Sequence, residues 1–220
     1  MSYKLTFEDG SSAYLEHHGV KGMHWGVWNA ETRARYNSLG STDYKEKGGV
    51  MPSGTNVSRV ATSAEDKIYD NKKYLSTNPS DHKKWEEYLG PANRSMLGKN
   101  TYNIMYETTK SVRIASNAEQ GKLFADKFLN STQSKQVIND TVTAYSKLHQ
   151  EITNKTTAEE LASMNMAAQT ETGKRFVEEL LKQGYGGVSD VHGQNVADDP
   201  VILFNPSENL KRVSYEKTKY

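Results

Sequence analysis

The sequence predicts an α+β protein, with an extended N-terminal arm followed by one mixed domain of short strands around two to three helices. Two observations predict this class. Short runs in which Val, Ile, Tyr and Thr alternate with polar residues are typical of strands, and they occur both early and late in the chain. Between them, apolar residues recur every three to four positions, as in amphipathic helices. With 220 residues, the chain is long enough to bury one sizeable core.

Composition argues against several classes of function. The 28 Lys and Arg residues balance the 27 Asp and Glu residues, so a net charge of +1 gives no overall field that attracts nucleic acid, and we expect no nucleic-acid partner. The chain has no Cys, which fits a protein made in a reducing cytoplasm. No apolar run reaches the roughly 18 residues of a membrane-spanning helix, so we expect no membrane partner. Acidic Glu8, Asp9 and Glu16 do not fit a secretion signal.

The first 49 residues are expected to form an arm rather than part of the domain. Residues 1–13 are a leader, in which the alternation of Tyr3, Leu5 and Phe7 predicts a short strand before an Asp-Gly turn. Residues 14–28 form a separate glycine-broken segment, discussed below. Residues 29–49 then supply a short helix and a glycine-rich polar stretch, which predicts a flexible linker.

The domain is expected to span residues 50–212 and to begin with strands. Alternation predicts strands over residues 56–62, 73–77 and 101–108. A helix is expected from Ser80, and Gly90 followed by Pro91 predicts its end.

Three helices follow, and for each of them the sequence indicates either the first residues or an apolar face. The first begins at a capping box, Ser116–Glu119. The second is an amphipathic helix over residues 138–152. The third begins at one of two overlapping capping boxes, Thr156–Glu159 or Thr157–Glu160, and Gly173 is a candidate break within it.

Strands return at the end of the domain. Residues 185–191 predict one strand. The continuous apolar run of residues 201–204, VILF, is typical of a strand buried on both faces. Residues 211–220 alternate weakly, which fits an edge strand or a tail, and we assign residues 213–220 to a tail.

The segment of residues 14–28, YLEHHGVKGMHWGVW, combines backbone freedom with large apolar side chains. Its glycines favour turns, while Met23, Trp25 and Val27 are residues of the kind that anchor interfaces. One interpretation is a docking tag for a partner, and the other is an arm that packs on its own domain. Its histidines have the wrong spacing for a zinc site and no Cys accompanies them, so we expect no metal.

Residues 18–27, HGVKGMHWGV, resemble a short tag usually written HGVKGMKWGV, with His24 where lysine is usual. This tag recurs in proteins of the head and structural gene clusters of tailed phages. The resemblance implies a virion-associated minor head protein, made in the bacterial cytoplasm, that docks on the major capsid protein, the portal or the scaffold, with self-assembly as a further option. The residues that carry the docking role are His18, Gly19, Val20, Lys21, Gly22, Met23, Trp25, Gly26 and Val27.

The strand order of the domain is similar to that of ADP-ribosyltransferase-like domains in phage minor structural proteins. That resemblance implies NAD as cofactor and a catalytic set of Arg59, Ser76 with the adjacent Thr77, and Asp199, where the family has glutamate. Aspartate is one methylene shorter than the glutamate that orients the ribose hydroxyl, so the sequence favours a structural role over an enzyme. From the residues alone, Arg59 also fits an ion pair and Ser76 a turn.

Overall fold

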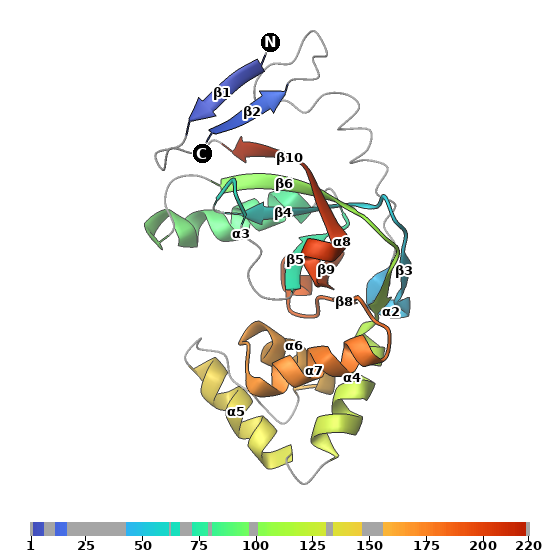
Figure 1. Cartoon of the computed structure of the whole chain (residues 1–220). Coiled ribbons are helices and arrows are strands. Elements are labelled where there is room, and N and C mark those ends of the chain that lie inside the picture. Colours follow the sequence, from blue (N-terminus) through green and yellow to red (C-terminus); the bar gives the residue numbers. More distant parts are fainter. Residues whose placement is uncertain are drawn as a thin grey trace.

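The computed structural model of the chain (Figure 1) confirms a mixed α and β architecture. It describes residues 2–6, 12–16, 43–61, 63–66, 72–78, 81–96, 101–130, 134–146 and 156–218. Within these residues, one eight-stranded sheet carries helices on its outer side, and a separate antiparallel hairpin precedes it.

The hairpin consists of β1 (Ser2–Thr6) and β2 (Ser12–Glu16). The strands of the main sheet are β3 (Gly49–Met51), β4 (Asn56–Ala61), β5 (Lys72–Ser76), β6 (Thr101–Thr108), β7 (Val112–Ala115), β8 (Gly187–Ser189), β9 (Pro200–Phe204) and β10 (Leu210–Thr218). The helices are α2 (Tyr44–Lys47), α3 (Asp81–Met96), α4 (Asn117–Phe124), the π-helical turn η1 (Ala125–Leu129), α5 (Ser134–Ser146), α6 (Ala158–Ala167), α7 (Glu171–Lys182), the 3₁₀ turn η2 (Gly193–Asn195) and α8 (Pro206–Asn209).

The main sheet has two halves that meet at one point. Its order is β10-β6-β4-β5-β9-β8-β7-β3, and every neighbouring pair is antiparallel except β7 and β8. The halves join where β4 meets β5, and the register there consists of the single pair Ser58 and Ser76. The strands β10-β6-β4 and the strands from β5 to β3 can therefore diverge from this point.

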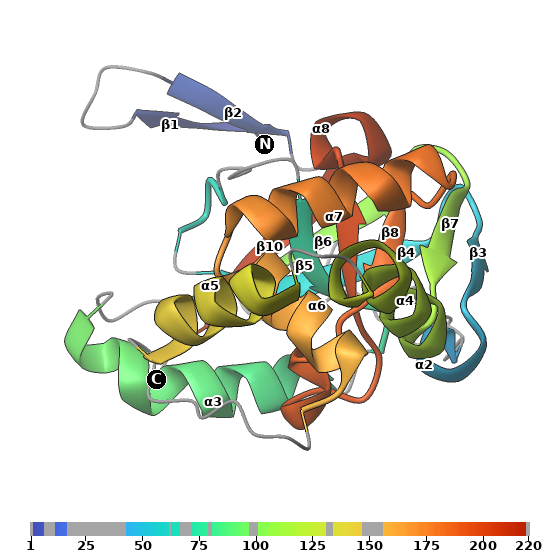
Figure 2. The same cartoon turned by 90° about the horizontal axis from the view of Figure 1, so that it is seen from below.

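Each face of the sheet packs against its own hydrophobic cluster. Strand β9 contributes side chains to both clusters, because successive side chains of a strand point to opposite faces. Val201 and Leu203 belong to the inner cluster with Tyr44 and Ile104, whereas Ile202 belongs to the outer cluster. The outer cluster includes phenylalanines of α4, η1 and α7, so these helices form a layer against β8 and β9. Figures 1 and 2 show this layer, with α3 lying separately along β4 and β6.

Several predicted elements are confirmed. The strands predicted over residues 56–62, 73–77 and 101–108 are β4, β5 and β6. The run VILF lies in β9, in which every residue is buried, as expected for a strand covered on both faces. Both side-chain and backbone bonds of the Ser116 capping box are present, and of the two overlapping boxes the one at Thr157 begins α6.

The structure corrects both predicted ends of the domain. Residues 44–51, assigned to the linker of 29–49 and its junction, form α2 and β3 instead, and Tyr44 is only 4% exposed in the inner cluster. The linker prediction was wrong because Tyr44 is the one apolar residue of α2, and the polar residues around it are typical of a linker. At the other end, the predicted tail of residues 213–220 continues β10 as far as Thr218, where it pairs with β6.

Two helix ends also differ from the prediction. Helix α3 continues through Gly90 and Pro91 to Met96, since a proline removes only one backbone hydrogen bond and other bonds can continue the helix. The break expected at Gly173 lies instead between Ala167 and Glu171, and Gly173 sits in the first turn of α7. Gln169 provides this break by adopting a left-handed backbone, with φ of 53°.

Candidate functional site

The sheet brings the strand ends that carry Ser76, Thr77 and Asp199 together. Asp199 precedes β9, and its backbone oxygen accepts hydrogen bonds from the Thr77 amide, at 3.2 Å, and from Thr77 Oγ1, at 3.3 Å. Its carboxylate accepts a bond from Asn78 Nδ2 at 3.2 Å. Two of the three predicted catalytic positions therefore lie side by side at the junction of β5 and β9.

Asp81, at the start of α3, organises this junction. Its side chain is fully buried, and its carboxylate accepts bonds from Ser76 Oγ at 2.5 Å, from the Asp198 amide at 2.7 Å and from the Asp199 amide at 3.0 Å. Lys84 Nζ lies 3.7 Å away and also contacts Asp198. The Ser76 hydroxyl is thus engaged with Asp81, in a structural role that ties β5, β9 and α3 to one another.

Arg59 lies on the opposite face of the sheet from Ser76. Ser58 is paired directly with Ser76, so alternation along β4 points Arg59 the other way. There its Nε lies 3.2 Å from Asp66 Oδ1, at an angle outside that of a hydrogen bond, so the contact is electrostatic. The structure therefore does not bring Arg59 and the Ser76 hydroxyl to one surface.

Asp66 is the centre of a buried polar cluster on the Arg59 face. Lys73 Nζ lies 2.8 Å from its Oδ2, and the Tyr106 hydroxyl donates a hydrogen bond to the same carboxylate. The Lys73 ammonium also lies 4.6 Å from the centroid of the Tyr106 ring, a cation–π geometry. Four side chains from β4, β5, β6 and the turn after β4 are thereby held together.

Burial governs the electrostatics of this cluster. Lys73 is 1% exposed, and desolvation lowers the pKa of its ammonium, although the hydrogen bond and charge of Asp66 oppose that shift. Burial, followed by the hydrogen bond to Asp66, raises the pKa of the Tyr106 hydroxyl. Arg59 and Arg212 lower both pKa values, which shows that positive charge gathers on this face. One carboxylate balances more than one cation.

This cluster was hard to predict from the sequence. Asp66 follows a strand and reads as a turn residue, and Lys73 is one of two adjacent lysines in β5. Only the strand pairing shows that Lys73 points inward beside Leu203, and that Tyr106, forty positions from Asp66, shares its face. The one available signal was alternation in β5, which places Lys73 and the buried Leu75 on the same side.

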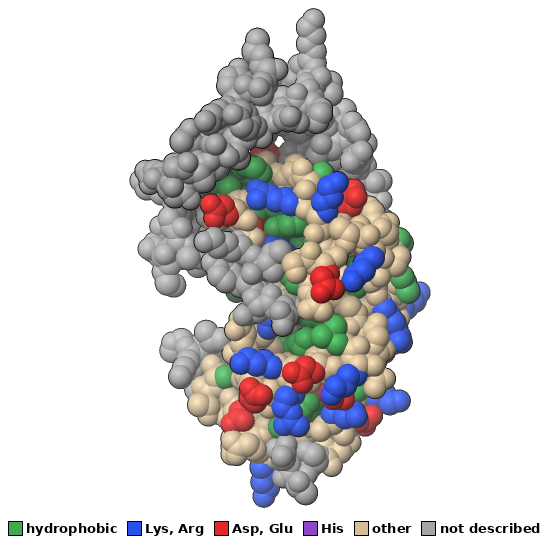
Figure 3. Space-filling view, in the orientation of Figure 1, with side chains coloured by type: hydrophobic (Ala, Val, Ile, Leu, Met, Phe, Trp, Pro, Cys, Tyr) green, Lys and Arg blue, Asp and Glu red, His purple; other side chains and the backbone are tan. Residues whose placement is uncertain are grey.

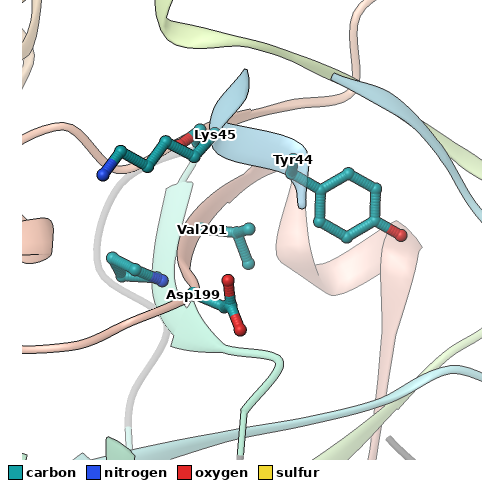
Figure 4. A pocket seen from close by; sticks show the side chains of 6 residues that line it. Tyr44, Lys45, Asp199 and Val201 are labelled. Carbon is teal, nitrogen blue, oxygen red and sulfur yellow. The ribbon is translucent and has the colours of Figure 1, made fainter. Parts of the chain in front are cut away.

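A shallow depression lies at the start of β9. It is lined by Tyr44 and Lys45 of α2, by Ser189, and by residues 199–201. Figure 4 shows the Asp199 carboxylate beside Val201, with the side chains of Tyr44 and Lys45 extending in different directions. Asp199 is thus the predicted catalytic residue that lines this depression, while its amide donates to Asp81 at the start of α3.

All of the predicted docking residues lie outside the described residues, and only the start of the segment 14–28 is described. Residues 14–16 are the last three of β2, and His18 through Val27 lie outside the described residues. Among the residues that are described, no group of three His, Asp or Glu side chains is placed to hold a metal ion. No helix within those residues is long and apolar enough to cross a membrane.

Comparison with known proteins identifies one short segment. The model of a family of unknown function, DUF7211, matches residues 8–31. Comparison with curated proteins and with solved structures gave no match. The matched segment contains the whole of residues 14–28 and ends before the first residue of the main domain.

Proposed function

We propose that this protein is a minor component of a tailed-phage head and that residues 14–28 dock it on a head protein. The observation that carries the proposal is that one matched segment lies inside another. The phage tag resemblance covers residues 18–27, and the family match covers residues 8–31, so the same stretch is singled out twice. The match supports treating this stretch as a unit that recurs in other proteins. The docking role itself comes from the tag resemblance.

The arrangement of the chain supports separate roles for the tag, which docks, and for the domain, which does not. Among the residues whose burial is described, which begin at residue 43, both hydrophobic clusters are drawn from residues between Tyr44 and Leu210. The tag supplies Met23, Trp25 and Val27 on a glycine-rich backbone, which suits apolar anchors that bury against a partner. In this proposal the tag selects the location, and the sheet domain is what is delivered there.

A binding experiment with matched variants tests docking. The full chain and its Met23→Ala/Trp25→Ala variant would be immobilised and exposed separately to purified major capsid protein, portal and scaffold. Tyr88→Ala is the control, because Tyr88 is an aromatic residue of α3 that is 61% exposed and lies outside the tag. We expect one head protein to bind the wild type and the control, and binding to fall at least about tenfold in the tag variant. Equal binding by all three would contradict the proposal.

A second candidate function, an ADP-ribosyltransferase-like effector carried in the virion, is favoured by one observation. Arg59 and Ser76 lie on the neighbouring strands β4 and β5, and Asp199 directly precedes β9, the next strand of the sheet. That order agrees with the family resemblance. Ser76 is bonded to Asp81 and Arg59 contacts Asp66, so these residues would have to exchange partners before they could share an NAD molecule.

Transfer of label from NAD to proteins of a host lysate tests this candidate. The wild type should transfer label, and Arg59→Ala should not, because the guanidinium would hold the NAD phosphates. Arg113→Ala is the control, since Arg113 is a half-exposed arginine that stacks on Tyr185 at 4.2 Å, away from the three strands. Absence of NAD binding by the folded wild type in calorimetry would remove the candidate.

A further inference from the structure

Within the part of the chain that the structure describes, the cluster around Asp66 has more cations than carboxylates. Lys73 Nζ and Arg59 Nε approach the carboxylate to 2.8 Å and 3.2 Å. A third cation, Arg212, lies opposite Tyr106 on the neighbouring strand, and alternation places it on the same face. Arg212 is exposed and its guanidinium lies 4.5 Å from the Tyr215 ring. Figure 3 shows Lys and Arg side chains beside hydrophobic ones in the region of β6 and β10.

Arg59 has N–H donors that no described residue accepts from. A guanidinium carries five N–H donors in a planar fork. Only its Nε faces Asp66, and its terminal nitrogens make no hydrogen bond to another described residue. The side chain is 30% exposed, whereas Lys73 is 1% exposed and donates to both the carboxylate and the backbone oxygen of Asp66. Arg59 is therefore the member of the cluster that solvent and a ligand can reach.

Asp66 enters the cluster from a short turn rather than from a strand. Its amide donates to the Ser63 oxygen at 3.2 Å, which closes a four-residue turn just after β4. Its φ of 38° is a left-handed value that costs free energy for a residue other than glycine. Contacts of its side chain with Arg59, Lys73 and Tyr106 keep the carboxylate inside the cluster and offset the free energy that the left-handed backbone costs.

We infer that Arg59, Lys73 and Arg212 form a binding site for a phosphate-type anion and that the Asp66 carboxylate is a built-in competitor that keeps this site closed. Arginine matches the geometry of phosphate oxygens with two parallel bonds. A phosphate can accept from Arg59 and Lys73 at once, whereas Asp66 accepts from Lys73 and makes only an electrostatic contact with Arg59, so exchange would leave neither cation without a partner. The inference rests on the second candidate function in that both use Arg59. It adds that Asp66 blocks anion binding at this site, and it does not require NAD chemistry.

Binding of inorganic pyrophosphate, measured by calorimetry at low salt, tests the inference in the full chain. Asp66→Asn removes the competitor. Asp66→Asn/Lys73→Met also removes the buried ammonium that the first change leaves unpaired, so at least one variant is expected to fold. Asp66→Asn should bind pyrophosphate at least about tenfold more tightly than the wild type, because removal of an opposing charge frees the Arg59 fork. The double variant lacks the Lys73 donor, so it should bind less tightly than Asp66→Asn but still more tightly than the wild type. Adding Arg59→Gln to the double variant should abolish the gain.

Glu208→Gln is the matched control, because it removes a carboxylate from the exposed Lys110–Glu208 pair, 3.4 Å apart, and changes net charge by the same amount as Asp66→Asn. Its affinity should equal that of the wild type. Equal affinity of the wild type and the folded double variant would overturn the inference, as would an equal gain in Glu208→Gln. Parallel titration with NAD separates the two ideas. A gain for pyrophosphate without NAD binding would sustain the anion site and remove the transferase candidate.

Discussion

At the scale of single residues, Asp81 is the side chain on which the junction of β5, β9 and α3 depends. It accepts bonds from the Ser76 hydroxyl and from the amides of Asp198 and Asp199 while fully buried. Asp81→Ala leaves buried donors without a partner, so we expect a loss of about 3 kcal/mol in the free energy of unfolding. Urea denaturation would measure this loss.

Asp198→Ala is the control for that change, since it removes a carboxylate from the same junction at an exposed position. Asp198 is 58% exposed and pairs with a lysine that is 39% exposed, so we expect a loss below about 1 kcal/mol. Similar losses for the two variants would show that Asp81 does not hold the junction.

Asp190 should make stability depend on pH. Burial raises the pKa of its carboxyl, and the hydrogen bond from the Gly193 amide only partly offsets this. A carboxyl whose folded pKa is raised contributes most below its unfolded pKa, about 4, and loses that contribution as pH rises toward the folded pKa. Asp190→Asn keeps an oxygen for the Gly193 amide and carries no charge. The stability of this variant relative to the wild type should therefore increase from pH 4 to pH 7.

Urea denaturation of both proteins at pH 4 and pH 7 measures this difference. A difference between Asp190→Asn and wild type that is the same at both pH values would contradict the expected linkage.

At the scale of elements, contact between α6 and α7 depends on Gly173. A Cβ at this position would lie 2.1 Å from the Asn165 backbone oxygen, so the helices would have to separate. Gly173→Ala should lower the free energy of unfolding by about 2–3 kcal/mol, despite the better helix propensity of alanine. At Gly121, the nearest atom is Glu159 Oε2 at 2.7 Å, the end of a flexible side chain. Gly121→Ala should therefore change stability by less than about 1 kcal/mol. Equal effects in chemical denaturation would contradict this account.

Elements were predictable where the local pattern was long enough to repeat. Alternation over eight residues revealed β6, and a continuous apolar run revealed β9. Strands β3 and β7 were missed, because three or four residues are too few to establish a period. The end of α3 was misplaced because Gly90 and Pro91 favour termination but do not force it.

The Asp66 cluster was beyond local reasoning for a related reason. Its members come from four separate segments, and only the pairing of β4 with β5 and β6 puts them on one face. Sequence reasoning selected Arg59 and left open whether it was a ligand-binding residue or part of an ion pair. The structure shows the ion pair, with a partner that no motif indicated.

At the scale of the whole molecule, the position of the domain boundary can be tested by truncation. The sequence placed the boundary at residue 50, whereas Tyr44 of α2 is 4% exposed in the inner cluster and β3 pairs with β7. A chain of residues 43–220 keeps these contacts. A chain of residues 50–220 loses Tyr44, and deletion of a buried aromatic side chain costs about 3–5 kcal/mol.

We therefore expect residues 43–220 to unfold at nearly the same urea concentration as the full chain, and residues 50–220 to unfold at a clearly lower one. The comparison also tests the division between tag and domain, because the longer truncated chain lacks residues 14–28 altogether. A fold that survives that deletion should fail to bind the head protein that the full chain binds. If residues 43–220 were instead as unstable as residues 50–220, the N-terminal segment would be part of the fold, and docking by an independent tag would lose its basis.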